Sequence, residues 1–251
     1  MPQNDQNFPV AAAVGQLFIN DVYFLNYHIN HDKWDWFRMF DVTEAHRDIE
    51  DFDVYDAGDW TIVETGAGTR ALTDHVNGVL LITNAAADND SNEIIRVAEA
   101  FKLVLNYPLY AEIRFKISDA TQSDFYFGLI ASGGGGYFAG IDDGVYFLKD
   151  DGDANIDFCT ELNTAVTKTD TGIDMTDLGW VRLGFHWDGH DTVRYFVLRD
   201  ADRYVLATGK HTAGICQDEE LLLAFGIRNG EAVAKVMYVD YTKVVQKRVI
   251  E

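Results

Sequence analysis

The stretch YAEIRFKI, residues 110–117, decides the fold class of this 251-residue chain. Its apolar residues, at 111, 113, 115 and 117, alternate with Glu112, Arg114 and Lys116. This period of two is typical of a strand with one face in a core and the other in water. The segment therefore predicts a half-buried strand.

A hairpin is predicted further along the chain. Residues 180–187 alternate in the same way, and Asp188-Gly189 separates them from a second apolar run at 192–198. Asp-Gly is a common turn between paired strands, because glycine tolerates a positive φ. Similar short runs predict strands at 78–83, 100–105, 124–131, 144–148, 156–161, 203–208, 221–227 and 233–244. Short strands separated by turns, without a long run of period 3.6, indicate an all-β jelly-roll sandwich.

Composition limits the partners. The chain carries 41 acidic and 20 basic side chains, a formal charge of -21, which should repel nucleic-acid phosphates. No run approaches the apolar length of a membrane helix, and the first residues lack the pattern of a signal peptide. We therefore expect no nucleic-acid or membrane partner, and synthesis in the cytoplasm.

Two regions are predicted, a sandwich over residues 56–251 and an N-terminal arm or contact segment over residues 1–55. The arm contains the aromatic stretch HDKWDWFRMF, residues 31–40. It can pack along the sandwich as local core, or become ordered only against a partner. For the second case we expect the contact residues to be Trp34, Trp36, Phe37 and Phe40, with Arg38 at the rim, because aromatics and Arg dominate interface hot spots.

Catalytic motifs are missing from the sequence. Glycoside hydrolysis needs two carboxylates held across one bond, and we find no Glu-x-Asp-x-x-Glu pattern within an apolar strand. There is no Gly-x-Ser-x-Gly elbow or His-Glu-x-x-His motif either. The glycine run 132–136 lacks the Lys of a phosphate-binding loop, so it predicts a strand connection. We expect no enzymatic activity.

Metal ligands and single polar residues give weaker signals. Asp88, Asp90 and Glu93 could offer oxygens to calcium, although acidic turns more often cap their own backbone, so no cofactor is the main expectation. His186, on the polar face of its strand, is predicted to face solvent or a sugar. Cys159 and Cys216 are predicted to be buried free thiols.

Several segments together resemble a known family. They are GDWTIVETGAG at 58–68, GVLLITNAAADND at 78–90, SDATQSD at 118–124 followed by FGL at 127–129, DGVYFLK at 143–149 and LGFHWDG at 183–189. Over about residues 56–245 the chain is similar to concanavalin-like structural proteins of tailed bacteriophages, particularly marine ones. The resemblance implies a concanavalin A-like jelly roll.

The same resemblance implies a non-enzymatic virion protein, a capsid decoration (cement) protein on the head exterior. Its expected partners are the major capsid protein and copies of itself, with a trimer favoured. One alternative is a carbohydrate-binding module of a tail fibre or bacterial surface protein, with Tyr126, Trp180 or Tyr195 stacking on sugar rings. Another is a glycoside hydrolase with an unusual carboxylate pair.

Overall fold

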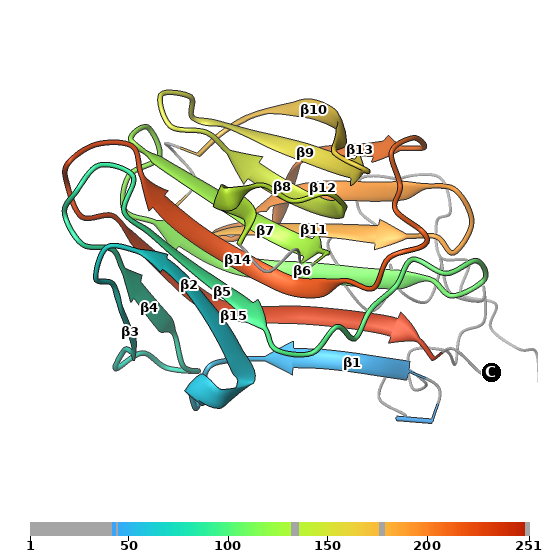
Figure 1. Ribbon diagram of the computed structural model, residues 1–251, viewed down its shortest axis with the longest axis horizontal. Helices are drawn as coiled ribbons and strands as arrows, with labels where there is room; N and C mark the ends of the chain where they lie inside the picture. The colour runs from blue at the N-terminus through green and yellow to red at the C-terminus, as the bar shows by residue number, and fades with distance from the viewer. Residues whose placement is uncertain (1–41, 44, 132–135, 176–178, 249–251) are drawn as a thin grey trace, which may run out of the picture.

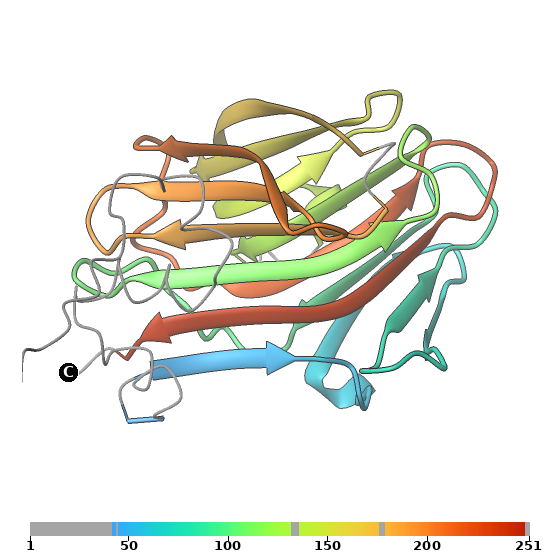
Figure 2. The same cartoon turned by 180° about the vertical axis from the view of Figure 1, so that it is seen from behind.

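The computed structural model describes residues 42–43, 45–131, 136–175 and 179–248 and contains two antiparallel sheets packed face to face (Figures 1 and 2). The eight-stranded sheet has the order β13-β12-β11-β6-β15-β4-β3, and β1 pairs with β15 as well. Its strands are β1 (Ala45–Glu50), β3 (Thr69–Leu72), β4 (Leu80–Thr83), β6 (Leu109–Ile117), β11 (Val181–Trp187), β12 (Val193–Arg199), β13 (Tyr204–His211) and β15 (Val236–Lys247).

The second sheet has seven strands in the order β10-β9-β8-β7-β14-β5-β2 and lies in front in Figure 1. These strands are β2 (Trp60–Thr65), β5 (Ser91–Arg96), β7 (Ser123–Ile130), β8 (Gly144–Lys149), β9 (Asn155–Leu162), β10 (Ala165–Asp174) and β14 (Leu222–Asn229). Two short 3-10 helices, η1 (Ala57–Asp59) and η2 (Tyr137–Ala139), complete the elements. The described part of the chain has no helix long and apolar enough to cross a membrane.

The core lies between the sheets, where alternate residues of facing strands meet. Phe115 of β6 lies 4.8 Å, between ring centroids, from Phe125 of β7, and Phe158 stacks on Tyr195 at 4.5 Å. Cys216 is also buried in this core, and Cys159 is buried on the opposite face of β9, in a second apolar cluster. Both thiols are unpaired, which confirms the prediction for the cysteines.

The structure confirms the all-β sandwich and most predicted strands. Strand 110–117 is β6, and the predicted hairpin is β11–β12, with Gly189 at a φ of 78° in its turn. The prediction of a strand at 100–105 is wrong, because that segment forms only isolated bridges through Phe101 and Val104. Strands β1, β2, β3, β5 and β10 were not predicted. The apolar residues of β5 are adjacent and those of β10 are sparse, so neither strand shows the alternation.

The face of β6 that was predicted to be wet is partly buried. Glu112 is fully buried, and it accepts hydrogen bonds from the hydroxyls of Tyr110 and Tyr241. His186, predicted to face solvent or a sugar, is also fully buried, so this prediction is wrong. Strand alternation identifies the face that a side chain occupies, but not whether that face is covered.

Residues 45–50, within the predicted arm, form β1 and pair with the end of β15, from Ala45 opposite Lys247 to Glu50 opposite Thr242. Arg96 of β5 joins this strand to the other sheet, because its guanidinium donates to both Asp48 and Glu50. The same guanidinium lies 3.9 Å from the ring centroid of Trp60. Strand β1 is thereby held to both sheets.

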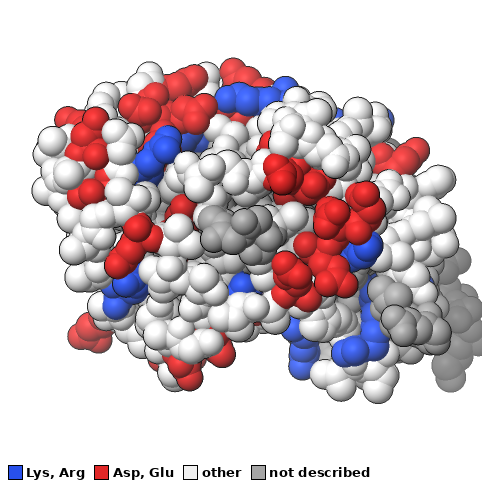
Figure 3. Space-filling view, in the orientation of Figure 1, with Lys and Arg blue, Asp and Glu red and all other residues white. Residues whose placement is uncertain are grey.

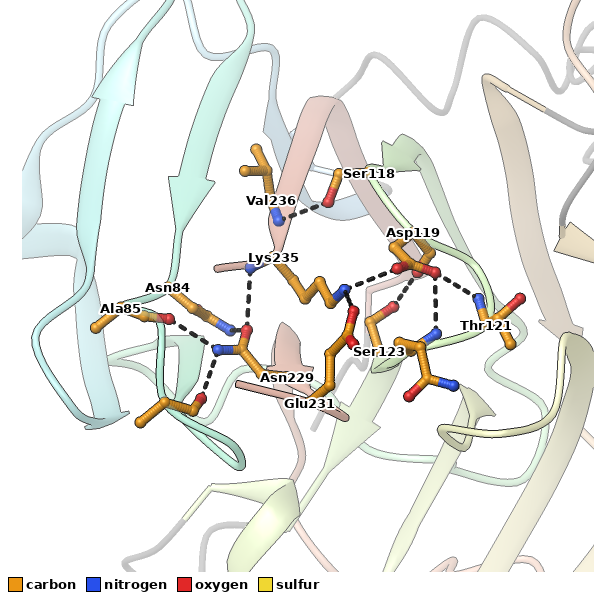
Figure 4. A network of polar contacts seen from close by, with 12 residues as sticks. Asn84, Ala85, Ser118, Asp119, Thr121, Ser123, Asn229, Glu231, Lys235 and Val236 are labelled. Atoms are coloured by element: carbon orange, nitrogen blue, oxygen red, sulfur yellow. Dashed lines mark hydrogen bonds and ion pairs between the residues drawn. The ribbon is translucent and has the colours of Figure 1, made fainter. Parts of the chain in front are cut away.

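A polar network holds three connections together at one end of the sandwich (Figure 4). The side chain of Asn229, which is fully buried, donates to the carbonyls of Ala85 and Ala87 and accepts from Asn84 and from the backbone N–H of Lys235. The ammonium of Lys235 in turn reaches Asp119 at 2.7 Å and Glu231 at 2.6 Å.

The carboxylate of Asp119 is strongly stabilised in this network. Although burial raises its pKa, hydrogen bonds from Lys235 and from the N–H groups of Gln122 and Thr121 lower it to about 2. The carboxylate thus remains charged down to strongly acidic pH.

Replacing Asn229 by Leu tests the network. Leu has a similar volume but leaves several buried polar groups unpaired, so we expect the free energy of unfolding to fall by about 3 kcal/mol or more. Urea unfolding measures the change. The matched control is Asn155→Ala, which removes one 3.4 Å hydrogen bond at an exposed site and should cost less than about 1 kcal/mol. Equal losses in the two variants would contradict this role for Asn229.

Candidate binding groove

The outer face of the seven-stranded sheet carries a row of functional side chains. The register places Glu93 of β5 opposite Gly226 of β14, and Gly226 opposite Tyr126 of β7. The row continues through β8 to Asp157 of β9. All of these point away from the core, because Ile94, Phe127, Phe158 and the other alternate residues point into it.

Two further rows run parallel to the first. In one, Gly128, Tyr146 and Cys159 lie side by side on β7, β8 and β9. In the other, Ile130 and Gly144 are followed by Glu161. The hydroxyl of Tyr146 donates to the carboxylate of Glu161 at 2.7 Å, so the second and third rows are linked.

The segment from Gly136 to Gly140, which contains η2, lies over the middle of this face. Tyr137 stacks on Tyr126 with ring centroids 4.6 Å apart and also contacts Tyr146 at 5.0 Å. The backbone N–H of Phe138 donates to Glu93 at 3.2 Å. A Cβ at Gly136 would clash with the carboxylate of Glu93, so a larger residue here would require that side chain to move.

A groove of about 320 Å³ remains beside this segment. Its wall is formed by three aromatic side chains, Tyr137, Phe138 and Tyr146. One end is lined by Asp124, Lys149, Asp150 and Arg228, and the other by Gly140, Ile141, Glu161 and Val166. Asp124 and Glu161 stand six residues apart along the strands by register, which corresponds to about 20 Å.

Charged groups at the first end of the groove are already paired with one another. Arg228 contacts the carboxylate of Asp124 at 2.5 Å, and its guanidinium lies 4.7 Å from the ring centroid of Phe138. The buried ammonium of Lys149 donates to the carbonyls of Ser123 and Asp150. Burial lowers the pKa of Lys149 and raises that of Asp124, each opposed by neighbours of opposite charge. This end offers a planar cation, carboxylate oxygens and aromatic surface together.

Carboxylates on the rest of the face also titrate above their usual range. Burial is the main cause of the raised pKa of Glu161 and of Glu93. Burial likewise raises the pKa of Asp157, which shares the ammonium of Lys168 with Asp150 at 2.5 and 3.3 Å. Figure 3 shows acidic side chains gathered in groups on the side of the molecule that carries this sheet, with a few Lys and Arg among them.

The proposed calcium ligands do not converge. Asp88 is exposed, the carboxylate of Asp90 accepts the N–H of Ala87 within its own turn, and Glu93 faces the outer side of β5. Over the described residues, no group of three or more His, Cys, Asp or Glu could hold a metal ion.

The aromatic candidates are separated as well. Tyr195 lies in the core and Tyr126 is covered by Tyr137. Trp180 packs against the Arg114 guanidinium at 4.4 Å, on the other sheet. The interface candidates Trp34, Trp36, Phe37, Arg38 and Phe40 lie outside the described residues.

Tyr137, Tyr146, Glu161 and Arg228 were not identified from the sequence as site residues. Alternation within 144–148 and 156–161 places Tyr146 and Glu161 on one face of their strands, so a signal for these two exists. No comparable signal marks Tyr137, because it follows a glycine-rich connection whose path the sequence does not define.

Comparisons with known proteins identify the fold. No family model and no curated protein matches the sequence. Among solved structures, a protein of unknown function from Shewanella oneidensis MR-1 matches with a TM-score of 0.61 and 16% identity, over 83% of this chain and 90% of that one. Lectin II from Ulex europaeus matches with a TM-score of 0.59 and 9% identity, over 82% of this chain and 100% of that chain.

An endo-1,3-beta-glucanase from Streptomyces sioyaensis matches with a TM-score of 0.56 and 13% identity, over 82% of this chain and 98% of that one. The chain therefore has the jelly-roll fold of concanavalin-like lectins and glucanases, as predicted. At these identities the likeness establishes the fold and leaves function to the site itself.

Replacing Glu93 by Gln tests the electrostatics of the covered face. Because burial raises the pKa of Glu93 in the folded state, its contribution to stability is present below the unfolded value and is lost as pH rises through the folded value. Gln still accepts the N–H of Phe138 but does not ionise. We expect Glu93→Gln to be more stable relative to the wild type at pH 7 than at pH 4, measured by urea unfolding.

The exposed Glu99→Gln serves as the control and should show no such difference. If the difference in unfolding free energy between Glu93→Gln and the wild type were the same at pH 4 and pH 7, burial would not raise the pKa of Glu93.

Proposed function

We propose that this protein is a non-enzymatic binding protein that holds a neutral saccharide in the groove on the outer face of the seven-stranded sheet. The observation that carries this proposal is the composition of the groove, in which aromatic side chains line the wall and hydrogen-bonding groups occupy both ends. Sugar rings offer an apolar face to aromatics and hydroxyls to polar groups.

The charge of the groove supports a neutral ligand. Its lining contains three carboxylates, Asp124, Asp150 and Glu161, against Lys149 and Arg228. The whole chain has a formal charge of -21. The acidic lining of the groove and the negative charge of the whole chain would both repel uronic acids, sulfated sugars and other anionic glycans.

The placement of the carboxylates supports binding without hydrolysis. A glycosidase holds two carboxyl groups about 5 to 9.5 Å apart across the scissile bond. The backbone positions of Asp124 and Glu161 are about 20 Å apart along the strand direction. Asp150 and Asp157 are closer to each other, but the ammonium of Lys168 binds both. Both carboxylates are thus engaged in an ion pair on the sheet surface.

The fold agrees with this proposal at a coarse level. A lectin from Ulex europaeus and an endo-1,3-beta-glucanase from Streptomyces sioyaensis are among the structures that share the sandwich. Carbohydrate binding by this chain remains our proposal, and it rests on the groove.

The resemblance described above suggests a second candidate function, that of a decoration protein on the exterior of a phage head. Its support in the structure is β1, which holds residues 45–50 to the sandwich directly after the aromatic segment 31–40. A segment attached in this way could bridge a stable body to the major capsid protein. Trimer formation and multiple contacts would then raise avidity.

The saccharide proposal predicts binding to neutral glycans on an array. Asp150→Asn and Glu161→Gln should each weaken binding by about 1.5 to 3 kcal/mol, because hydrogen bonds to charged groups are worth about this much. Titration calorimetry with the best neutral oligosaccharide measures the loss. The exposed Glu219→Gln is the control and should bind as the wild type does.

Two results would contradict the saccharide proposal. One is the failure of every neutral glycan to bind, and the other is binding that neither groove substitution weakens. Hydrolysis of the bound sugar that a single Asp or Glu change abolishes would instead identify an enzyme.

The virion setting predicts saturable co-sedimentation with phage heads that lack the protein. Bound protein should raise the temperature at which packaged DNA is released, because a ligand that binds only the assembled shell stabilises it by mass action. The Trp34→Ala/Trp36→Ala double variant should bind more weakly, since aromatic side chains dominate interface hot spots. Unchanged occupancy in this variant would exclude Trp34 and Trp36 as the contact residues.

A further inference from the structure

The two ends of the groove differ in how their charges are compensated. At the first end, the guanidinium of Arg228 contacts Asp124 at 2.5 Å, and the ammonium of Lys149 donates to two backbone carbonyls. At the other end, Glu161 stands among glycine and aliphatic residues, and no described lining residue there is basic. The groove is therefore polar along its length, with an anionic end at Glu161.

The carboxylate of Glu161 is only partly engaged. The hydroxyl of Tyr146 donates to its Oε2 at 2.7 Å, and the described part of the chain offers no donor to Oε1. Lys168 lies on the same face of the neighbouring strand β10, but its ammonium binds Asp157 at 2.5 Å and Asp150 at 3.3 Å. Glu161 is 6% exposed and lines the groove, so its Oε1 remains available to a ligand there.

The surroundings of Glu161 favour a positively charged ligand group. Burial is the largest cause of its raised pKa, and the charges of Asp143 and Asp142 raise the pKa further. A poorly solvated carboxylate that faces other negative charges is stabilised when a cation comes within reach. The rings of Tyr137 and Tyr146 line the same groove, and aromatic rings also attract cations.

We propose that the Glu161 end of the groove binds the ammonium group of an amino sugar within an otherwise neutral saccharide. The inference rests on the proposed function, because it assigns one end of the same groove. Arg228 and Lys149 disfavour a cation at the first end, where the backbone of Asp124 lies about 20 Å from that of Glu161 along the strands. The ammonium is thus directed to Glu161, where its hydrogen bond to a carboxylate is stronger than that of a neutral hydroxyl or amide.

Pairs of matched sugars test the assignment. An array presents oligosaccharides of glucosamine, galactosamine and mannosamine, each beside its fully N-acetylated counterpart. Titration calorimetry at about pH 6 then measures the affinity of every pair that binds. We expect the free-amine form to bind about tenfold more tightly than the acetylated form in at least one pair, because the hydrogen bond is made between charged groups.

Glu161→Gln should abolish this preference. Gln keeps the shape of the side chain and still accepts from Tyr146, but it has no charge, so the two forms should bind within about twofold of each other. The exposed Glu219→Gln lowers the charge of the chain by the same amount and should keep the full preference. This control separates recognition at the groove from general attraction to an acidic protein. Circular dichroism checks that both variants are folded.

The possible results separate this inference from the saccharide proposal. If the wild type bound the free-amine forms no more tightly than the acetylated forms, the ammonium assignment would be overturned, whereas saccharide binding would stand. A preference that survived Glu161→Gln would also overturn it, because the ammonium would then lie elsewhere. If no sugar bound, the saccharide proposal and the ammonium assignment would fail together.

Discussion

The pairing register of β7, β8, β9 and β14 is the constraint on which the groove depends. Side chains alternate strictly between the two faces of a strand, so a slip by one residue would exchange the core set for the groove set along the whole strand. The register is fixed from within, because Phe125, Phe127 and Phe158 fill the space between the sheets and no charged neighbour could replace them there. Packing of the core thus positions Tyr146 and Glu161 on the outer face of the seven-stranded sheet.

The seven-stranded sheet is partly buried on both faces, unlike a sheet that has one face in the core and the other in solvent. All eight residues of β7 are buried, because the core covers one face and the segment that carries Tyr137 and Phe138 covers part of the other. The carboxylate of Glu93 is consequently held in a poorly solvated position against a backbone N–H. Raised pKa values on this face are the electrostatic result of that cover.

Alternation in the sequence was sufficient to predict the sandwich, and it located β6, β11 and β12 within a residue or two. It failed where both faces are buried, as in β5, and where an edge strand has few apolar residues, as in β10. The groove was harder to predict from the sequence, because Tyr137 and Arg228 come together through tertiary packing between a loop and β14. Burial of His186 was not predictable for the same reason, since cover comes from outside its own strand.

Strand β15 has a consequence for how the chain folds during synthesis. Its twelve residues pair with β6 on one side and with both β4 and β1 on the other. It is also the last of the described strands to leave the ribosome. Until then β6 lacks its neighbour on one side, and neither β1 nor β4 can join the sheet through it. The nascent sandwich therefore exposes open strand edges, which makes closure of the eight-stranded sheet a late step in folding.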